Sequence, residues 1–214
     1  MEAAPGVADL SLPVDWPQRL RAVLAAEPAP AHSAQVTGLM PEGKVTPAAV
    51  LLPIVQRDAG PMLLLTQRAG HLRQHAGQVS FPGGRIEAGD AGAMAAALRE
   101  THEEIGIEPR FVEPLGYLPG QLVLTGFSIT PLVGLVRPGF VLRIDATEVA
   151  DVFELPLAVV ALEQSFRVVP RQVRGVQLQL HELPWEGRVI WGATAAMLRN
   201  FGTLLRQALT GGAA

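Results

Sequence analysis

The chain has 214 residues, of which 49% are apolar and 17% are charged, and this composition allows one domain with a sizeable core and excludes a disordered chain. Its formal net charge of -3 gives no reason to expect a nucleic-acid-binding protein, whose surface would be basic. The absence of cysteine excludes disulfides, cysteine-ligated zinc and thiolate nucleophiles, and it fits a reducing compartment.

The N-terminal residues lack the features of a secretory signal. Residues 1–12 contain two acidic residues, no basic residue and no apolar core. The charge-free stretch 114–136 contains three prolines and several glycines, which would break a membrane-spanning helix, so two buried strands explain it better. We therefore expect a soluble, cytoplasmic protein that has no membrane partner.

The first half of the chain predicts one short helix followed by a hairpin. Asp15 is placed to cap a helix that runs to about Ala26, and the segment 27–33 has the composition of a linker. Two apolar runs, 48–55 and 62–66, flank a short polar turn and predict a β-hairpin. A further strand is expected to enter residues 81–84.

The second half predicts a mixture of strands and helices. An alanine-rich helix over 91–105 is expected to stop at Gly106. Strands are then expected at 112–118, 122–136 and 149–155, followed by a short helix, two strands and a closing helix over 193–209. This order predicts an α/β/α sandwich with a mixed β-sheet. We expect residues 1–34 to form an N-terminal helix and linker, and residues 35–214 to form the main domain.

Three glutamates near the end of the 91–105 helix indicate a cation site. Glu100, Glu103 and Glu104 are three and four positions apart and so project from one helix face. Their charges repel one another and face the negative end of the helix dipole, so a bound cation would stabilise them. Hard oxygen ligands on an open site suit Mg²⁺ or Mn²⁺. The alternative is a solvated acidic face, which is the commoner meaning of such a pattern.

The residues before this helix extend the pattern. A double glycine, Gly83–Gly84, lets the backbone approach an ion closely. Together with Asp90, Arg99, the three glutamates and Gly106, it resembles the Nudix box, Gly-x5-Glu-x7-Arg-Glu-U-x-Glu-Glu-x-Gly-U, in which U is a bulky apolar residue. This chain differs at three points: Asp90 replaces the first glutamate, eight residues instead of seven precede Arg99, and Thr101 stands at the first U.

A second block resembles the motif of the coenzyme A pyrophosphatase branch of the Nudix superfamily. That motif is Leu-Leu-Thr-x-Arg-[Ser/Ala]-x3-Arg-x3-Gly-x3-Phe-Pro-Gly-Gly, and the segment 64–84 matches every specified position. Its two arginines, Arg68 and Arg73, suit phosphate oxygens, although each could instead form a structural salt bridge. The resemblance extends over about residues 47–198.

The resemblance implies a fold, a reaction and a set of roles. The fold would be the Nudix α/β/α sandwich, and the reaction would be metal-dependent hydrolysis of coenzyme A to 4'-phosphopantetheine and adenosine 3',5'-bisphosphate. Acyl or oxidised coenzyme A would be further substrates. Glu100, Glu103 and Glu104, with the Gly83 carbonyl, would hold Mg²⁺ or Mn²⁺, and Arg99 would orient a glutamate. Glu103 is our first choice as proton acceptor, and Glu148 is the second.

Other interpretations remain open at this stage. The substrate could be another nucleoside diphosphate derivative, such as ADP-ribose or NADH, and a domain that only binds a ligand is a further alternative. A homodimer, paired through an edge strand or the C-terminal helix, is a hypothesis with no specific support. A phosphate-binding P-loop, or Walker A loop, at 38–44 is set aside, because Val45 replaces the required serine or threonine and the segment precedes a strand instead of following one.

Overall fold

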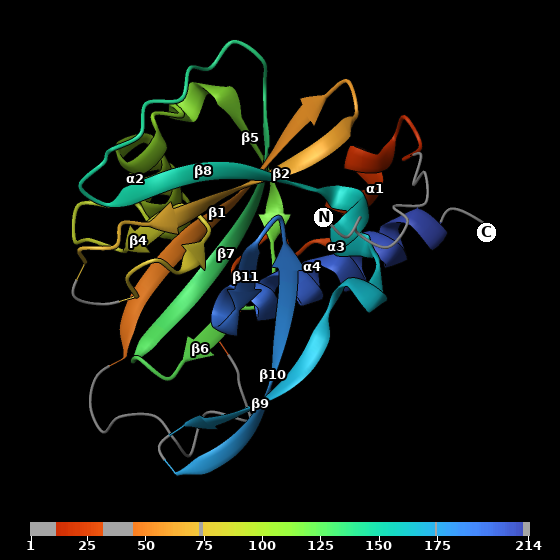
Figure 1. Cartoon of the computed structure of the whole chain (residues 1–214). Coiled ribbons are helices and arrows are strands. Elements are labelled where there is room, and N and C mark those ends of the chain that lie inside the picture. The colour runs from red at the N-terminus through yellow and green to blue at the C-terminus, as the bar shows by residue number, and fades with distance from the viewer. Residues whose placement is uncertain (1–11, 32–44, 73–74, 174, 212–214) are drawn as a thin grey trace.

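The computed structural model describes residues 12–31, 45–72, 75–173 and 175–211. Within these ranges the chain forms an eight-stranded mixed sheet, a three-stranded sheet and four α-helices (Figure 1). The large sheet consists of β1 (Thr46–Arg57), β2 (Gly60–Arg68), β3 (Val79–Ser80), β4 (Gly83–Arg85), β5 (Val112–Tyr117), β6 (Gln121–Val123), β7 (Phe127–Val136) and β8 (Val149–Pro156). The small sheet consists of β9 (Arg167–Val173), β10 (Val176–Trp185) and β11 (Arg188–Trp191). The helices are α1 (Trp16–Val23), α2 (Ala93–Ile105), α3 (Leu157–Ala161) and α4 (Gly192–Thr210), with 3-10 turns at Pro109–Phe111 and Glu163–Ser165.

The long strand β1 is the centre of the large sheet because it is paired along both edges. On one edge it runs parallel to β7, in register from Thr46 opposite Phe127 to Val55 opposite Val136. Two antiparallel strands share the other edge, with β4 beside residues 48–50 and β2 beside residues 54–57. The short strand β4, which carries the double glycine, is therefore held directly against the centre of the sheet.

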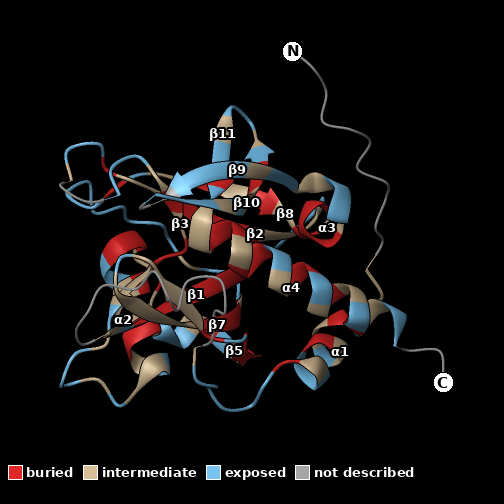
Figure 2. Ribbon diagram, turned by 90° about the horizontal axis from the view of Figure 1, so that it is seen from below, coloured by how far each residue is buried: buried red, intermediate tan, exposed pale blue. Residues whose placement is uncertain are grey.

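Both faces of the sheet are covered by helices. Ala49 and Leu51 of β1 lie in a core with buried residues of α2, whereas Val50 and Leu52 lie in a second core with residues of α1, α3 and α4. Figure 2 shows α2 and α4 on opposite sides of β1 and β7. This burial of both faces explains the continuous apolar run in β1. The predicted α/β/α sandwich with a mixed sheet is confirmed.

Helix α2 ends where the sequence predicts and begins two residues later. Gly106 adopts a left-handed conformation with φ of 79°, and its N–H donates to the carbonyl of His102 at 2.9 Å. A residue with a side chain is strained at that φ, so glycine is suited to this end of the helix. At the start, Gly92 has φ of 117°, which keeps residues 91 and 92 in the preceding loop.

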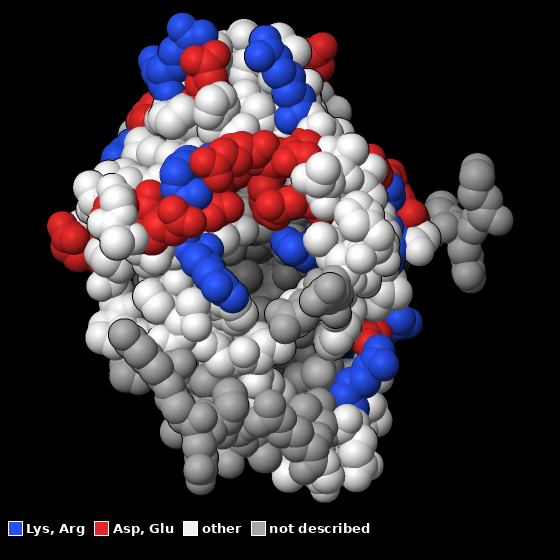
Figure 3. All heavy atoms as spheres, turned by 90° about the vertical axis from the view of Figure 1, so that its left-hand side faces the viewer, with Lys and Arg blue, Asp and Glu red and all other residues white. Residues whose placement is uncertain are grey.

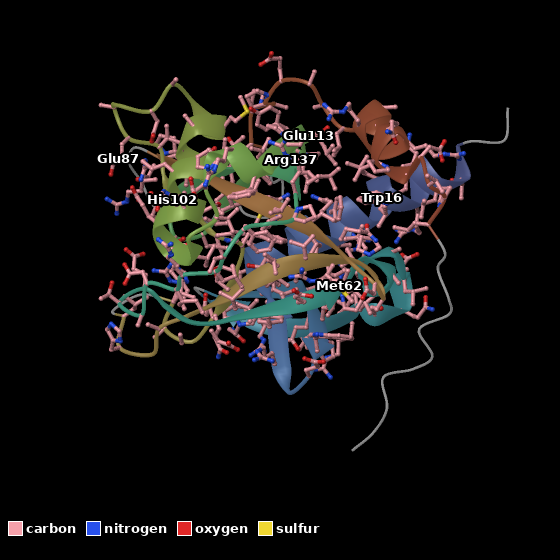
Figure 4. The ribbon with its side chains drawn as sticks, turned by 90° about the horizontal axis from the view of Figure 1, so that it is seen from above. Trp16, Met62, Glu87, His102, Glu113 and Arg137 are labelled. Atoms are coloured by element: carbon pink, nitrogen blue, oxygen red, sulfur yellow. The ribbon has the colours of Figure 1, made fainter. Side chains whose placement is uncertain are left out.

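The N-terminal helix is shorter than predicted, and Asp15 occupies its N-cap position without a side-chain capping hydrogen bond. Helix α1 ends at Val23, and Asp15 makes no capping hydrogen bond. The Asp15 carboxylate instead accepts a hydrogen bond from Nε of Arg19 at 2.8 Å, one turn along the helix. Trp16 and Leu20 of α1 are buried, and Figure 4 shows Trp16 on the opposite side of the molecule from Glu87 and His102.

The strands lie where the sequence predicts them, but the structure has more strands than predicted. The hairpin of β1 and β2 closes with Arg57 opposite Gly60. The single strand expected over 122–136 is divided, because the N–H of Gly126 donates to Val123 in a turn between β6 and β7. Three strands, rather than two, follow α3.

The charge-free stretch 114–136 forms most of β5 together with β6 and β7, one strand more than predicted. Across the residues that the structure describes, no helix has the length and apolar character needed to span a bilayer.

We predict that Gly202→Ala destabilises the protein although alanine is the better helix former. Gly202 is buried in α4, and an added Cβ would overlap the backbone carbonyl oxygen of Val160 in α3. That overlap should outweigh the helix-propensity gain of about 1 kcal/mol. Thermal unfolding should show a fall of several degrees in Tm. Thr203→Ala, at the exposed neighbouring position, should shift Tm far less, and equal shifts would contradict the packing argument.

Candidate functional site

The candidate site lies where the C-terminal half of α2 meets β4. Glu100 and Glu104 lie against the double glycine, with the Glu100 carboxylate beside Gly84 and the Glu104 carboxylate bonded to the Gly83 N–H. Glu103 lies one turn from Arg99 and is more exposed. Figure 3 shows acidic side chains gathered in a band on the face of the molecule at the left of Figure 1. Basic side chains lie within and below this band, beside a hollow in the surface.

Arg99 connects most of the acidic groups of this site. Its Nε and Nη2 donate to the two oxygens of Asp90, each at 3.0 Å. Its Nη1 donates at 3.0 Å to both Glu100 and Glu103. Its Nη2 also reaches the backbone carbonyl of Arg85 in β4 at 3.1 Å. One guanidinium therefore fixes two glutamates, the preceding loop and the neighbouring strand.

Asp90 takes part in the site despite the extra residue before Arg99. The longer spacing is absorbed in the loop that ends at Gly92, and the Asp90 side chain is 7% exposed. Its carboxylate also accepts the N–H of Glu87 at 2.8 Å. The hydrogen bonds from Arg99 are the main reason that the pKa of Asp90 lies below its usual range. The aspartate thus anchors Arg99 from a position one residue further away than in the usual box.

The double glycine allows α2 to approach β4 closely. An added Cβ at Gly84 would overlap the carboxylate of Glu100, and one at Gly83 would overlap the backbone of β1. Gly83 also has φ of 152°, which only glycine adopts readily. Its N–H donates to Oε2 of Glu104 at 3.1 Å. Gly84 therefore leaves the space in which the Glu100 carboxylate lies, while Gly83 packs closely on β1 and binds Glu104 through its N–H.

Glu104 is a buried carboxyl group at the centre of the site. Its side chain is 5% exposed, and this burial raises its pKa to about 8. The Gly83 N–H and the nearby Arg68 oppose that rise, with Nη1 of Arg68 at 3.9 Å from Oε1 of Glu104. Arg68 is the last residue of β2, and this position places its side chain at the site. Burial also raises the pKa of Glu100, and the charges of Glu103 and Glu148 act in the same direction.

Glu148 is held near the site by the loop before β8. The N–H groups of Arg143 and Asp145 donate to the carbonyls of Ile105 and Glu104, each at 2.9 Å. These carbonyls belong to the C-terminal end of α2 and would otherwise lack a partner. The Glu148 carbonyl in turn accepts the N–H of Ala69 at 2.8 Å, immediately after Arg68. The loop therefore places an exposed Glu148 carboxylate where its charge raises the pKa of both Glu100 and Glu104.

The expected convergence of three glutamates is found only in part. Among the described residues, no three histidine, cysteine, aspartate or glutamate side chains come close enough together to hold an ion on their own. Glu103 turns toward Arg99 and is 57% exposed, whereas Glu104 turns toward β4. The exposed Glu103 carboxylate is therefore paired with Arg99, whereas the buried Glu104 carboxylate is paired with β4.

The donor set still fits a hard divalent cation on an open site. Glu100 and Glu104 offer carboxylate oxygens, burial disfavours their charged forms, and a nearby cation would offset that cost. Mg²⁺ usually keeps several waters and shares its remaining positions between one or two carboxylates and substrate phosphates. Two converging carboxylates beside a backbone strand match that requirement.

Several residues singled out in the sequence lie elsewhere. Arg73 and the Walker-like segment 38–44 fall outside the described residues, so the structure does not place them. Gly77 adopts φ of 70° in the turn before β3, and Thr66 bonds to Ser80 within the sheet. His102 is exposed and lines, with Glu103, a cavity of about 480 Å³ at the end of α2. Glu103 is therefore accessible from solvent.

The sandwich fold and this acidic helix together define a Nudix protein. A family model described as "NUDIX domain" matches residues 45–185, and the chain belongs to this family. It is 43% identical over 153 residues to "Uncharacterized Nudix hydrolase NudL" of Enterobacter sp. (strain 638), which covers 72% of this chain and 79% of that relative. The NudL protein of Salmonella newport (strain SL254) is 46% identical over the same shares. A solved structure, the MutT protein of Methanosarcina mazei Go1, is 17% identical, covers 78% of this chain and 96% of its own, and has a TM-score of 0.49.

Membership of this family supports hydrolysis of a phosphoanhydride bond in a nucleoside diphosphate derivative. Nudix hydrolases generally use divalent ions such as Mg²⁺ or Mn²⁺, which agrees with the oxygen donors of Glu100 and Glu104.

We predict that Gly84→Ala weakens divalent-ion binding without unfolding the protein. The added methyl would displace the Glu100 carboxylate, the flexible end of a side chain, and not the backbone. Mn²⁺ affinity measured by calorimetry should fall roughly tenfold or more, whereas Tm should change little. Gly89→Ala is the matched control, because no atom lies within 4 Å of its added Cβ. Unchanged Mn²⁺ affinity in the Gly84 variant would contradict this account.

We predict that Asp90→Asn lowers stability in a pH-dependent way. The pKa of Asp90 is depressed in the folded state, so its ionised form stabilises the fold above the unfolded-state pKa of about 4. That contribution is lost as the pH falls through the depressed value. Urea unfolding at a series of pH values should show the gap between wild type and variant at pH 7 shrinking in strong acid. A gap that does not depend on pH would refute the ion-pair explanation.

Proposed function

We propose that the protein hydrolyses the diphosphate bond of coenzyme A, yielding 4'-phosphopantetheine and adenosine 3',5'-bisphosphate. Acyl and oxidised forms of coenzyme A are proposed as further substrates. The observation that carries this choice is the match of residues 64–84 to the coenzyme A pyrophosphatase motif at every specified position. In a small-molecule site of this kind, the oxygen donors and the arginines would both be directed at phosphate groups.

The positions of the motif residues support this proposal. The two leucines at its start, Leu64 and Leu65, are fully buried on opposite faces of β2 and anchor that strand. Arg68 at the end of β2 lies beside Glu104, and Gly83 and Gly84 lie in β4 against α2. The motif residues thus form the strand β2, the arginine at its end, Arg68, and the double glycine of β4, and both Arg68 and the double glycine lie beside α2.

Glu100 and Glu104 are proposed as the principal ion ligands, with Glu103 and the Gly83 carbonyl completing the protein's share. Arg68 and Arg73 are proposed to bind substrate phosphates. Arg99 is proposed to hold Glu100 and Glu103 in place through its two hydrogen bonds at 3.0 Å. A bound Mg²⁺ or Mn²⁺ would neutralise diphosphate oxygens and lower the pKa of water.

Glu103 is proposed as the group that accepts the proton of the attacking water. Its carboxylate is fixed by Arg99 and open to solvent, so it can both take the proton and release it. The water oxygen forms the new bond to phosphorus, and the bridging oxygen leaves with the departing phosphate. Glu148 is the alternative acceptor, because its loop holds it close to Glu100 and Glu104.

We predict that Glu103→Gln lowers kcat for coenzyme A about 100-fold or more, because the amide cannot accept the proton. The purified protein would be incubated separately with coenzyme A, ADP-ribose and NADH, each with Mg²⁺, with Mn²⁺ and with a chelator. Products would be separated by chromatography. Release of adenosine 3',5'-bisphosphate from coenzyme A, dependent on the divalent ion, is the expected result.

Glu113→Gln is a matched control for that variant. Glu113 is 53% exposed and pairs with Arg21, much as Glu103 is 57% exposed and pairs with Arg99, but it lies in β5 away from the site (Figure 4). Its kcat should equal that of wild type. Cleavage of ADP-ribose or NADH in place of coenzyme A would overturn the substrate and keep the family reaction. Full activity of the Glu103→Gln variant would contradict Glu103 as the proton acceptor and would favour Glu148.

A further inference from the structure

Arg85 lies next to the site but has no role in holding it together through its side chain. It directly follows the double glycine in β4 and is paired with Ala48 of β1. Only its backbone carbonyl is used there, as the acceptor for Nη2 of Arg99. Its backbone is therefore fixed to Arg99, whereas its side chain takes no part in the hydrogen bonds of the site within the part of the chain that the structure describes.

The Arg85 side chain projects from the face of β4 opposite to Glu100. Successive residues of a strand point to opposite faces, and the Glu100 carboxylate occupies the space on the side-chain face of Gly84. The guanidinium of Arg85 lies over the ring of Phe127, 5.7 Å from its centroid. Phe127 is the first residue of β7 and is paired with Thr46 of β1, two positions from the partner of Arg85.

Among the described residues, no acidic group pairs with the Arg85 guanidinium. Among the residues that the structure describes, its guanidinium forms neither a hydrogen bond nor an ion pair, and the side chain is exposed. Arg68, by contrast, lies 3.9 Å from Glu104, and Arg99 is surrounded by three carboxylates. A planar cation that rests on an aromatic ring, with its N–H groups free, is well prepared to bind a phosphate.

We infer that Arg85 binds a second phosphate of the substrate, one that is separate from the diphosphate under attack. This inference rests on the proposed function. Coenzyme A carries such a group, the 3'-phosphate on its ribose, and ADP-ribose and NADH do not. Arg85 would then be the residue through which the site distinguishes a nucleotide with a 3'-phosphate from one without it.

The position of Arg85 argues against contact with the reacting diphosphate. The proposed ion ligands Glu100 and Glu104 lie on the α2 side of β4, and the diphosphate must lie with them. The Arg85 guanidinium lies on the other side of the strand, above Phe127. A phosphate that reaches it must be carried on a different arm of the same molecule.

The experiment compares coenzyme A with 3'-dephospho-coenzyme A as substrates for wild type and Arg85→Gln. In wild type, kcat/KM should be higher for coenzyme A. The variant should lose about 10- to 100-fold in kcat/KM for coenzyme A, mainly through KM, the range expected for one hydrogen-bonded charge contact. Its kcat/KM for the dephospho form should stay within about twofold of wild type, so the preference between the two substrates disappears.

Two further variants sharpen the result. Arg199→Gln removes an exposed arginine of α4, away from the site, and should leave both substrates unaffected. Phe127→Leu removes the ring beneath the guanidinium and should reproduce part of the loss for coenzyme A alone.

The outcomes separate this inference from the proposed function. Equal losses for both substrates in Arg85→Gln would mean that Arg85 contacts a part they share, and would overturn the inference. An unchanged preference in that variant, or a wild type without any preference, would overturn it too. A wild type that cleaves neither compound would instead refute the proposed function.

Discussion

The arrangement of the site depends on one guanidinium among carboxylates. Arg99 donates hydrogen bonds to Asp90, Glu100 and Glu103 and to the backbone of β4. Without it, three negative groups would lie close together with only solvent to screen them, and α2 would lose its hydrogen bonds to the preceding loop and one of its two hydrogen bonds to β4. Arg99 reduces that repulsion without neutralising Glu104, which stays buried and available to a cation.

The second constraint is steric, and it acts in concert with the first. The carboxylate of Glu100 can lie against β4 only because Gly84 has no side chain, and Gly83 adopts a φ that other residues avoid. β4 is itself held against the most buried strand of the sheet. The acidic groups are therefore positioned by a rigid layer and not by a loop, which is how closely placed charges can be kept in one geometry.

The sequence predicts the frame of this molecule better than its details. The hairpin, the C-terminal end of α2 at Gly106 and the two helical layers follow from apolar periodicity and glycine position, and all are confirmed. Asp15 takes the predicted N-cap position, but its side chain does not cap the helix because it pairs with Arg19 one turn away. The break between β6 and β7 is a turn at Gly126, which could not be predicted because the surrounding residues form an apolar run typical of one continuous strand.

At the site, spacing along a helix identifies which carboxylates share a face but not where each one turns. That depends on the rotamer of Arg99 in the same helix, which Asp90 and the Arg85 carbonyl fix, and on the Gly83 N–H, a long-range partner of Glu104. The anchoring role of Asp90 likewise depends on how the loop absorbs an extra residue. The position of Arg85 directly after the double glycine was a usable signal, but only the register of β4 with β1 shows which way its side chain points.

The parallel pairing of β1 with β7 has a consequence for the order in which the protein can form during synthesis. β1 ends at Arg57, but the strand that completes its second edge begins only at Phe127. Contacts between such distant segments form late, because the intervening chain must first be closed into a loop. On the ribosome, β4 and α2 emerge before the sheet that supports them is complete. The β1–β7 pair against which the acidic helix packs can therefore form only after the chain through Val136 has left the exit tunnel.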